Sequence, residues 1–237
     1  MFVVTGGGTG IGRAVSLALA RSGEDVLVTG RRLGPLESLA DERGGIRYFQ
    51  CDNSQVEDVE RLVDQLDAPV RGLVHCAGGN PAIGRRDPVS LDEEVALLNE
   101  TMAGNLTSAV LTTLALEQRL ADDASVVLFG SIAAERGVGY YGPAKAAVGS
   151  FAVGLAARLG PRGIRVNCLS PGYIAGTEFF RGGMTEAREE QLRAQTFIGR
   201  VGALEDVVAA TMFLLSSGSR HVTGQTIHLN GGAFTSR

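Results

Sequence analysis

The chain has 237 residues but only three cysteines and three histidines, and their scarcity excludes two kinds of site. Cys51, Cys76 and Cys168 are odd in number and scattered through apolar segments, which argues against a disulfide framework and predicts buried free thiols in a reducing compartment. The histidines are too dispersed for metal-ligand spacing, so no metal site is predicted, and each is interpreted as a satisfied core or edge residue. They are His75, His221 and His228.

Long charged runs and long apolar runs are also missing. A net charge of -4 without a basic cluster argues against a nucleic-acid surface, because phosphate binding needs clustered Lys and Arg. No apolar run reaches the roughly 18 residues of a membrane span, and a first strand at Phe2 leaves no room for a secretion signal, so we expect a cytoplasmic protein without a membrane partner. Without tandem repeats or low-complexity linkers, we expect one domain over residues 1–237.

Short β-branched segments alternate along the chain with longer segments of helical periodicity. This alternation predicts an α/β fold, in which a parallel sheet is covered by helices on both faces. The longest helical segments are expected at residues 92–120 and 142–159. The seven predicted strands are residues 2–5, 25–29, 46–49, 72–75, 125–129, 164–169 and 226–229.

A glycine-rich segment, Thr5 to Gly12, lies between the first predicted strand and the first predicted helix. Five of the seven residues from Gly6 to Gly12 are glycine, which is more than a tight turn needs. A turn of small residues lets backbone N–H groups and the positive end of a helix approach a pyrophosphate. The segment therefore predicts a dinucleotide phosphate site, with a merely tight turn as the alternative. It is not a P-loop, because no Gly-Lys-Ser/Thr follows.

The stretch from Ser131 to Lys145 holds a hydroxyl, two adjacent phenols and an ammonium. Lys145 follows Tyr141 by four residues, so a helix beginning near Tyr141 places the two side chains on one face, whereas Tyr140 points away. A nearby ammonium favours the phenolate, so we expect a lowered pKa for Tyr141 and proton exchange near neutral pH. An ordinary helix face carrying a tyrosine and a lysine is the alternative.

These motifs together resemble those of the short-chain dehydrogenase/reductase family. Thr5, Gly6, Gly10 and Gly12 match its Thr-Gly-x-x-x-Gly-x-Gly pattern. The resemblance covers nearly the whole chain, and the subgroup most similar in appearance is the 3-oxoacyl-[acyl-carrier-protein] reductase type. Further motifs in family order are Asn105, Ser131, Tyr141, Lys145, Pro171-Gly172, Thr223-Gly224-Gln225 and Asn230-Gly231-Gly232.

The resemblance implies a fold and a reaction. The fold is a Rossmann fold whose seven-stranded parallel sheet has the order 3-2-1-4-5-6-7. The reaction is hydride transfer between a nicotinamide and an alcohol or carbonyl carbon, with Tyr141 donating the proton and Ser131 stabilising the same oxygen. Lys145 is implied to bind the nicotinamide ribose. Asn105 is implied to position a water in a proton relay, with a plain polar residue on a helix face as the alternative.

The end of the second strand, Thr29-Gly30-Arg31-Arg32, bears on the choice of cofactor. An acidic residue there binds the ribose of NAD, whereas a cation accommodates the 2′-phosphate of NADP. We predict that Arg31, assisted by Arg32, binds this phosphate, so NADP(H) is favoured over NAD(H); two solvated surface arginines are the alternative. The other cofactor-binding residues that the resemblance implies are Thr5, Gly6, Gly8, Thr9, Gly10, Ile11, Gly12, Asp52, Asn53, Ala77, Gly78, Tyr141, Lys145, Pro171, Gly172, Ile174 and Thr177.

Three positions have a second interpretation or depart from the family pattern. Asp52 could cap a helix that begins near Gln55. His75 and Cys76 replace the family's two asparagines, which puts in doubt the side-chain hydrogen bonding that steadies the sheet there. The interval from Ser131 to Tyr141 is a few residues shorter than usual, so we expect a tight loop using Gly137 and Gly139, and a more open substrate pocket.

Residues 178–200 carry many charges and four large apolar side chains. They predict a mobile substrate lid whose apolar residues face the ligand, with a peripheral amphipathic helix pair as the alternative. The apolar residues are Phe179, Phe180, Met184 and Phe197.

The predicted function is NADPH-dependent interconversion of a carbonyl and an alcohol. A 3-oxoacyl thioester is one candidate substrate, for which Arg85 and Arg86 are a candidate carrier-protein docking patch, and a small ketone, sugar or steroid is another. The alternative from a different class is a non-catalytic dinucleotide sensor, which would not need an intact Ser, Tyr and Lys set. By resemblance, the protein is expected to form a homotetramer or homodimer.

Overall fold

A computed structural model describes residues 1–236, and its centre is one seven-stranded parallel sheet of order β3-β2-β1-β4-β5-β6-β7. This order and the Rossmann-type fold agree with the sequence-based prediction. The strands are β1 (Phe2–Thr5), β2 (Val26–Gly30), β3 (Ile46–Gln50), β4 (Val70–His75), β5 (Leu120–Phe129), β6 (Arg165–Pro171) and β7 (Thr226–Leu229).

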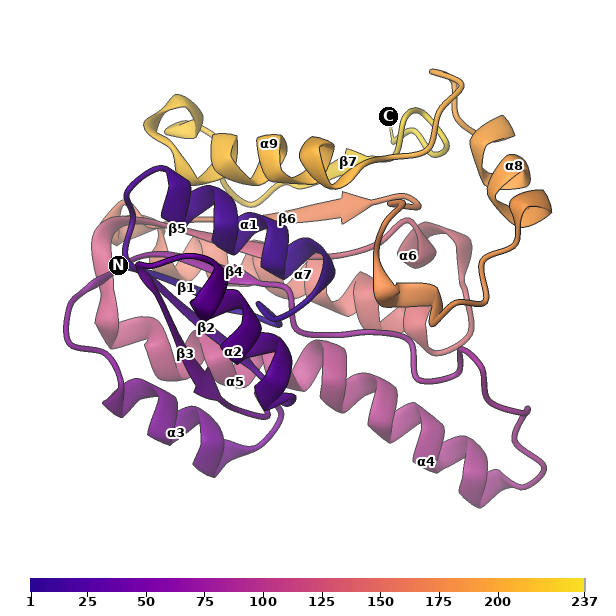
Figure 1. Cartoon of the computed structure of the whole chain (residues 1–237), viewed down its shortest axis with the longest axis horizontal. Helices are drawn as coiled ribbons and strands as arrows, with labels where there is room; N and C mark the ends of the chain where they lie inside the picture. The colour runs from indigo at the N-terminus through magenta and orange to yellow at the C-terminus, as the bar shows by residue number, and fades with distance from the viewer. Residues whose placement is uncertain (237) are drawn as a thin grey trace.

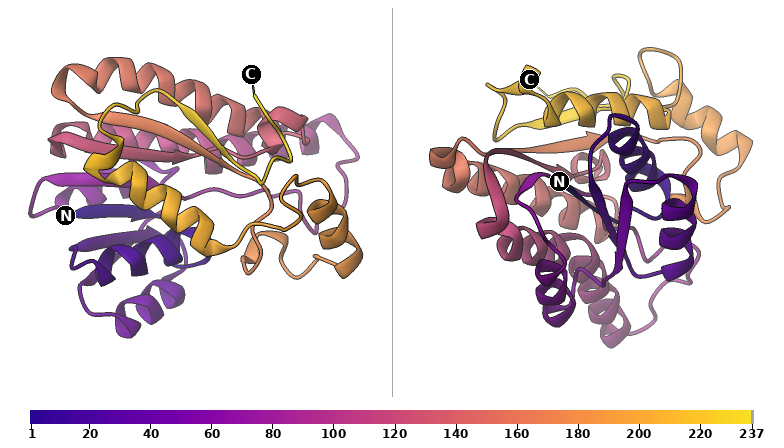
Figure 2. Two further views of the ribbon diagram at one scale, coloured as in Figure 1. Left: turned by 90° about the horizontal axis from the view of Figure 1, so that it is seen from above. Right: turned by 60° about the vertical axis from the view of Figure 1, so that its left-hand side comes forward.

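Helices cover both faces of the sheet, as Figures 1 and 2 show. One face packs against α1 (Gly10–Arg21), α2 (Leu33–Glu42) and α9 (Leu204–Leu215). The other packs against α3 (Val56–Asp64), α5 (Ser108–Leu116) and α7 (Tyr141–Leu159). Because both faces are covered, the strands are nearly continuous apolar runs.

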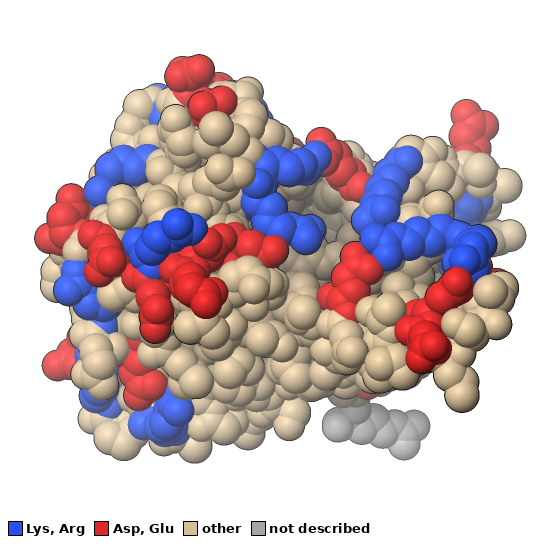
Figure 3. All heavy atoms as spheres, turned by 90° about the horizontal axis from the view of Figure 1, so that it is seen from below, with Lys and Arg blue, Asp and Glu red and all other residues tan. Residues whose placement is uncertain are grey.

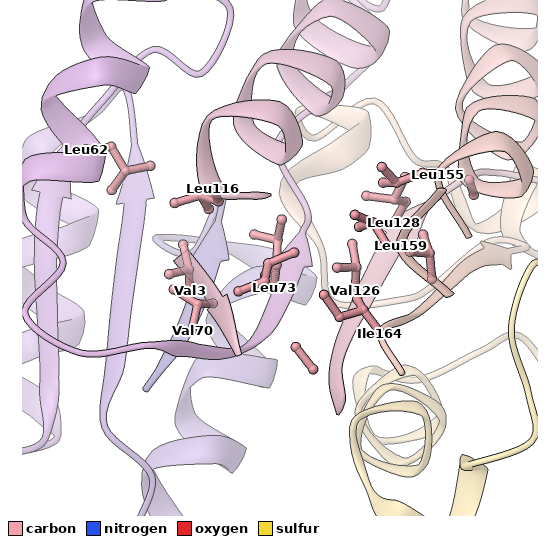
Figure 4. Packing of buried hydrophobic residues seen from close by; sticks show 14 of the residues in the cluster. Val3, Leu62, Val70, Leu73, Leu116, Val126, Leu128, Leu155, Leu159 and Ile164 are labelled. Atoms are coloured by element: carbon pink, nitrogen blue, oxygen red, sulfur yellow. The ribbon is translucent and has the colours of Figure 1, made fainter. Parts of the chain in front are cut away.

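Two apolar clusters, one on each face, hold these layers together. Val3 of β1 and Leu73 of β4 point toward Leu116 of α5, while Val126 of β5 packs beside Leu159 of α7 (Figure 4). Burial of each such side chain stabilises the fold by roughly 1.5–3 kcal/mol. The position of the sheet's carboxyl edge is therefore fixed by packing on both sides.

Several shorter elements stand at or near the carboxyl ends of the strands, on the right in Figure 1. They are α4 (Leu91–Met102), α6 (Ala133–Arg136), α8 (Glu186–Ala194) and a 3-10 turn, Glu178–Phe180. Further 3-10 turns lie at Glu117–Arg119, Gly160–Arg162 and Ser217–Ser219. None of the helices within residues 1–236 is long and apolar enough to cross a membrane.

The long middle segment departs from the single helix expected at residues 92–120. It consists of α4, a π-helical turn at Ala103–Thr107, α5 and a short 3-10 turn. Strand β5 also begins earlier than expected, at Leu120, because pairing with Val70 extends it through the polar residues Asp122 and Asp123. The π-helical turn carries Asn105, so this departure belongs to the site.

Candidate active site

The glycine-rich segment joins the end of β1 to the start of α1 at the carboxyl edge of the sheet. A Cβ on Gly6 would lie 2.8 Å from the Ala77 nitrogen, and one on Gly12 would overlap the Gly6 carbonyl. Thr9 makes no side-chain cap to α1, and the first turn of the helix has no acidic residue. The free N–H groups and the positive helix end therefore suit a pyrophosphate.

Residues from two other strand ends, those of β4 and β6, adjoin this cradle. Ala77 donates its N–H to the Thr5 hydroxyl (3.1 Å), which fixes the turn after β4 beside β1. After β6, Ile174 pairs with Gly202 in an isolated bridge, and the Thr177 side chain is the nearest group to Gly10. The predicted cofactor residues thus converge on one edge of the sheet.

Asp52 and Asn53 lie two and three residues past the end of β3. Asp52 accepts hydrogen bonds from the backbone and hydroxyl of Ser54, so the alternative that it caps α3 is wrong; Gln55 is the cap residue. The buried Asn53 side chain accepts from Thr29 and donates to Thr112. These bonds occupy the Asn53 side chain and leave its backbone for a cofactor.

Arg31 and Arg32 follow β2, and both are exposed. Arg32 donates to Glu178 (2.9 Å) and to the Thr9 hydroxyl (3.4 Å), so it bridges the glycine-rich segment and the 3-10 turn. Arg31 lies near Glu100, whose pKa is lowered mainly by its hydrogen bond with Arg85 and further by the charge of Arg31. Arg31 is thus the more available of the two for an added phosphate.

Ser131 and Tyr141 meet at the end of β5 and the start of α7. The Ser131 oxygen accepts a hydrogen bond from the Ala133 N–H (3.1 Å), which leaves its proton free to donate. Between them, Gly137 and Gly139 adopt left-handed φ values of 62° and 46°, as the short interval requires. These glycines form the tight loop that the spacing predicts.

The Tyr141 pKa is raised, contrary to the prediction that Lys145 lowers it. Burial raises the pKa of this phenol to about 12, and interaction with Ser131 opposes the rise. Lys145 lies over the ring, with Nζ 5.7 Å from the centroid, and donates to the Phe129 carbonyl (2.9 Å). Burial also lowers the Lys145 pKa to about 8. The expected effect of the ammonium is therefore outweighed by burial of the phenol.

Asn105 points from the π-helical turn to the segment after β4. Its side chain accepts from the Gly79 N–H (3.1 Å) and donates to the carbonyls of Gly79 and Thr101 (2.8 Å each). Gly78, with φ of 147°, lies against both Asn105 and Lys145; a Cβ there would be 2.6 Å from Asn105 Oδ1 and 3.2 Å from Lys145 Nζ. Asn105 and Lys145 thus adjoin one another across Gly78.

Tyr140 points away from this group, as its spacing predicts. Its hydroxyl donates to Glu94 of α4 at 2.5 Å, and this hydrogen bond raises the Tyr140 pKa. The bond anchors the start of α7 to α4. Tyr141 is therefore the phenol that faces Ser131 and Lys145.

The 3-10 turn Glu178–Phe180 lies over the phenol of Tyr141. The Phe179 ring centroid is 5.6 Å from that of Tyr141 and 5.0 Å from that of Phe180, which in turn packs against Tyr173. Phe197 differs from the prediction because its side chain is largely solvent-exposed, beside Gly232, rather than facing a ligand. Met184 is half-buried.

The sequence did not indicate one group that the structure places at the site, whereas it did indicate the state of His75. The Phe129 carbonyl receives Lys145, a role for backbone that no side-chain pattern indicates. His75 is buried and bonded through both ring nitrogens, to Thr5 and Ser108. This confirms the prediction that His75 is a satisfied core residue.

Some of the remaining histidines and cysteines are not in the buried, satisfied positions that were expected for them. His221 is exposed, and His228 Nδ1 is buried without a partner in residues 1–236, so neither is a satisfied core residue. Cys51 and Cys168 are buried, whereas Cys76 is half-buried. Over the same residues, no cluster of three or more His, Cys, Asp or Glu is placed to hold a metal ion.

Basic side chains stand on both rims of a hollow in the face shown in Figure 3, with acidic groups interspersed. Arg85 forms a two-pronged ion pair with Glu100, and Arg86 forms one with Glu93. Both candidate docking arginines are therefore already paired within the chain.

Comparisons with known proteins agree with this geometry. The family described as "Enoyl-(Acyl carrier protein) reductase" matches residues 6–234. "Dehydrogenase/reductase SDR family member 4" of Homo sapiens is 33% identical over 243 residues, covering 97% of this chain and 86% of the relative. "(3R)-3-hydroxyacyl-CoA dehydrogenase" of Rattus norvegicus is 32% identical, covering 98% and 95%.

A further relative and a solved structure extend the likeness. "3-oxoacyl-[acyl-carrier-protein] reductase" of Mus musculus is 31% identical and covers 97% of this chain and 95% of the relative. A short-chain type dehydrogenase/reductase from Mycobacterium ulcerans superimposes with a TM-score of 0.87 at 31% identity, covering 98% of this chain and 88% of that one.

Proposed function

This chain belongs to the short-chain dehydrogenase/reductase family and is an NAD(P)-dependent oxidoreductase acting on CH–OH groups, and we propose that it uses NADPH to reduce an apolar carbonyl compound. The observation that carries the proposal is the convergence of Ser131, Tyr141 and Lys145 beside the glycine cradle. A bound nicotinamide would supply or accept the hydride.

In the reductive direction, Tyr141 donates its proton to the carbonyl oxygen. A phenol whose pKa is about 12 is fully protonated at neutral pH, which suits a donor. Ser131, whose oxygen already accepts from Ala133, donates to the same substrate oxygen and stabilises its developing charge. Lys145 contributes a charge beside the phenol, and Asn105 fixes the segment at Gly78 that adjoins Lys145.

The preference for NADPH rests on Arg31. Its guanidinium is exposed after β2 and can bind a 2′-phosphate through two donors, while Arg32 engages Glu178 and Thr9. The Arg31→Asp variant should raise the KM for NADPH with little change in the KM for NADH. A wild-type enzyme with higher kcat/KM for NADH would overturn this preference.

The substrate class rests on the aromatic side chains over Tyr141. Phe179 and Phe180 present apolar surface next to the phenol, which favours an aliphatic or aromatic ketone over a sugar. Two relatives named for acyl thioester chemistry support a 3-oxoacyl thioester as a second candidate. Internal pairing of Arg85 and Arg86 favours a free thioester over one carried on an acidic protein.

Oligomer formation is part of the proposal. Val89, Leu91 and Val95, at the start of α4, are exposed by 80%, 83% and 53%. An apolar strip of this kind supports packing against a second copy. Light scattering after size exclusion should give a dimer or tetramer mass.

A matched pair of tyrosine variants tests the catalytic assignment. Tyr141→Phe should lower kcat by roughly 10²-fold or more, because it removes the general acid, while NADPH still binds in a fluorescence titration. Tyr140→Phe, which keeps Tyr141, should retain most activity. The substrates are acetoacetyl thioesters, small diketones, steroids and sugars, with NADPH oxidation followed by absorbance. Activity in Tyr141→Phe together with loss in Tyr140→Phe would reverse the assignment.

A further inference from the structure

A buried hydrogen-bond chain runs from the glycine-rich segment to the π-helical turn through His75. His75 lies at the end of β4 and is 2% exposed. Its Nδ1 is 2.9 Å from the Thr5 hydroxyl, and its Nε2 is 3.2 Å from the Ser108 hydroxyl. This hydrogen-bond chain thus links β1, β4 and the start of α5.

The neighbouring bonds fix where each proton lies. The Ser108 hydroxyl donates to the Gly104 carbonyl (2.9 Å), so it must accept from His75 Nε2–H. Nδ1 then carries no proton and accepts from the Thr5 hydroxyl, which itself accepts from the Ala77 N–H. Every donor and acceptor in the chain is satisfied by a neutral imidazole. Lys145, the charged group facing His75, also disfavours a second proton.

The hydrogen-bond chain ends at the π-helical turn that carries Asn105. Ser108 is the first residue of α5, and the Gly104 carbonyl to which it donates lies in the π-helical turn Ala103–Thr107. A π turn bonds each carbonyl to the fifth residue onward and is rare, so tertiary contacts must hold it. The Asn105 side chain then reaches Gly79, two residues past Ala77. His75 therefore ties both segments that Asn105 joins.

We propose that His75 is a positioning residue, which acts through Ser108 to set the π-helical turn and thereby aim Asn105 at the segment beside Lys145. The inference rests on the proposed function, in which Lys145 and Tyr141 manage the proton. His75 itself touches neither of these reacting groups in the chain of bonds described. Its effect on turnover passes through Asn105.

Two variants break the same bond from opposite sides. His75→Asn keeps an amide oxygen near Nδ1 for Thr5 but is too short to reach Ser108, and Ser108→Ala removes the acceptor. Each should lower kcat by roughly tenfold while changing the KM for NADPH by about twofold or less, because only alignment at the reacting end is lost. His75→Gln, which can extend a donor toward Ser108, should recover part of the loss.

A double-mutant cycle separates positioning from general weakening of the fold. In an Asn105→Ala background, His75→Asn should have no further effect on kcat, because its route is already removed. Thr113→Val is the matched control, since within residues 1–236 this buried hydroxyl of α5 bonds only to the Ala109 carbonyl of its own helix. It should leave kcat unchanged. Effects of His75→Asn and Asn105→Ala that multiply would overturn the inference.

A readout independent of turnover is hydrogen exchange at the Gly79 amide, which Asn105 Oδ1 accepts. Exchange there should quicken in His75→Asn and Ser108→Ala and stay unchanged in Thr113→Val. Unchanged exchange in all three would overturn the inference even if kcat fell. Turnover retained in Tyr141→Phe would instead overturn the proposed function, and the Gly79 exchange would still decide the role of His75.

Discussion

The Tyr141 phenol and the Lys145 ammonium are both buried, and burial shifts their pKa values in opposite directions. It raises the pKa of the phenol to about 12 and lowers that of the ammonium to about 8. In each case the neutral form is favoured because charge is costly in an apolar environment. The lysine is therefore the residue of this pair whose charge changes within a working pH range.

The first prediction concerns the alkaline limb of the reductive reaction. Lys145 carries its charge below pH 8 and loses it above, so kcat/KM for carbonyl reduction should fall as the pH rises through about 8. Initial rates from pH 6 to 10 measure this. Lys145→Arg should move the fall to higher pH, because a guanidinium stays charged. A wild-type profile that is flat to pH 10 would contradict the assignment.

The second prediction concerns acid stability and His75. Its pKa is about 3 in the fold, mainly because of burial, against 6.5 in a free side chain. Between these values the unfolded chain binds a proton that the folded chain does not, so the free energy of unfolding falls by up to about 1.4 kcal/mol per pH unit as the pH drops.

Urea unfolding at pH 7, 6, 5 and 4 measures this effect in the wild type and in His75→Asn. The variant cannot take up the proton, so its free energy of unfolding should decline less steeply with acid. Parallel declines in the two proteins would show that His75 is not the responsible group.

The direction in which each tyrosine side chain points could be predicted from residue spacing, whereas the burial of each side chain could not. The four-residue interval to Lys145 correctly distinguishes Tyr141 from Tyr140, whose hydroxyl turns to Glu94. The predicted direction of the Tyr141 pKa shift was wrong, because desolvation of the phenol depends on packing in α7 and against Phe179. Such long-range burial leaves no local pattern in the sequence.

At the scale of elements, the apolar strands were predictable and their polar extensions were not. β1 and β7 have the expected bounds because each is one short run of apolar or β-branched residues, interrupted only by His228 in β7. The π-helical turn of Ala103–Thr107 contains the weak helix formers Gly104, Asn105 and Thr107, but no composition distinguishes π from α hydrogen bonding, which here depends on Ser108 and on contacts from β4. Only the assembled structure could reveal it.

The third prediction concerns Arg165, which holds the end of α9 against β6. This buried guanidinium donates to the carbonyls of Leu214, Ser216 and Ser219 and to the Ser219 hydroxyl. Arg165→Met would remove these charge-assisted hydrogen bonds and should lower the free energy of unfolding by about 1.5–3 kcal/mol, although Ser125 and Ser219 still donate to the Leu214 carbonyl.

The matched control is Arg158→Met, which removes an exposed ion pair with Glu117. It should cost about 1 kcal/mol or less in urea unfolding. Similar losses in the two variants would contradict the capping role of Arg165.

At the scale of the whole molecule, the sheet is one unit and the segment at 178–200 stands outside it. The parallel direction of the strands could be predicted because each helix between two strands must return the chain to the same edge of the sheet. The family resemblance then predicted the order of the strands. Apolar residues facing the site were predicted for the segment at 178–200, whereas the contact of the Phe179 ring with Tyr141 was not, because it depends on side-chain packing. The prediction that all four apolar side chains of the segment face a ligand was wrong for Phe197, whose side chain faces solvent.

The fourth prediction concerns proteolysis of the segment 178–200, which stands outside the sheet. Limited trypsin digestion should cut first after Arg181, Arg188 or Arg193, which are exposed on short elements, and leave the remaining chain folded. NADPH should slow the cut if it orders Thr177 and its neighbours. Mass spectrometry identifies the sites. First cuts after Arg85 or Arg86 would place the most mobile segment elsewhere.

The π-helical turn also sets the angular phase of the long middle segment. Because it holds one residue more than an α-helical path, side chains on α4 and α5 are offset by about 100° relative to one uninterrupted helix. A deletion of one residue within 103–107 would restore ordinary backbone bonding and rotate one half of the segment against the other. The outer side chains of α4 and the core-facing side chains of α5 could then not both keep their present directions. The number of residues in this turn is therefore as tightly constrained as the identity of a core side chain.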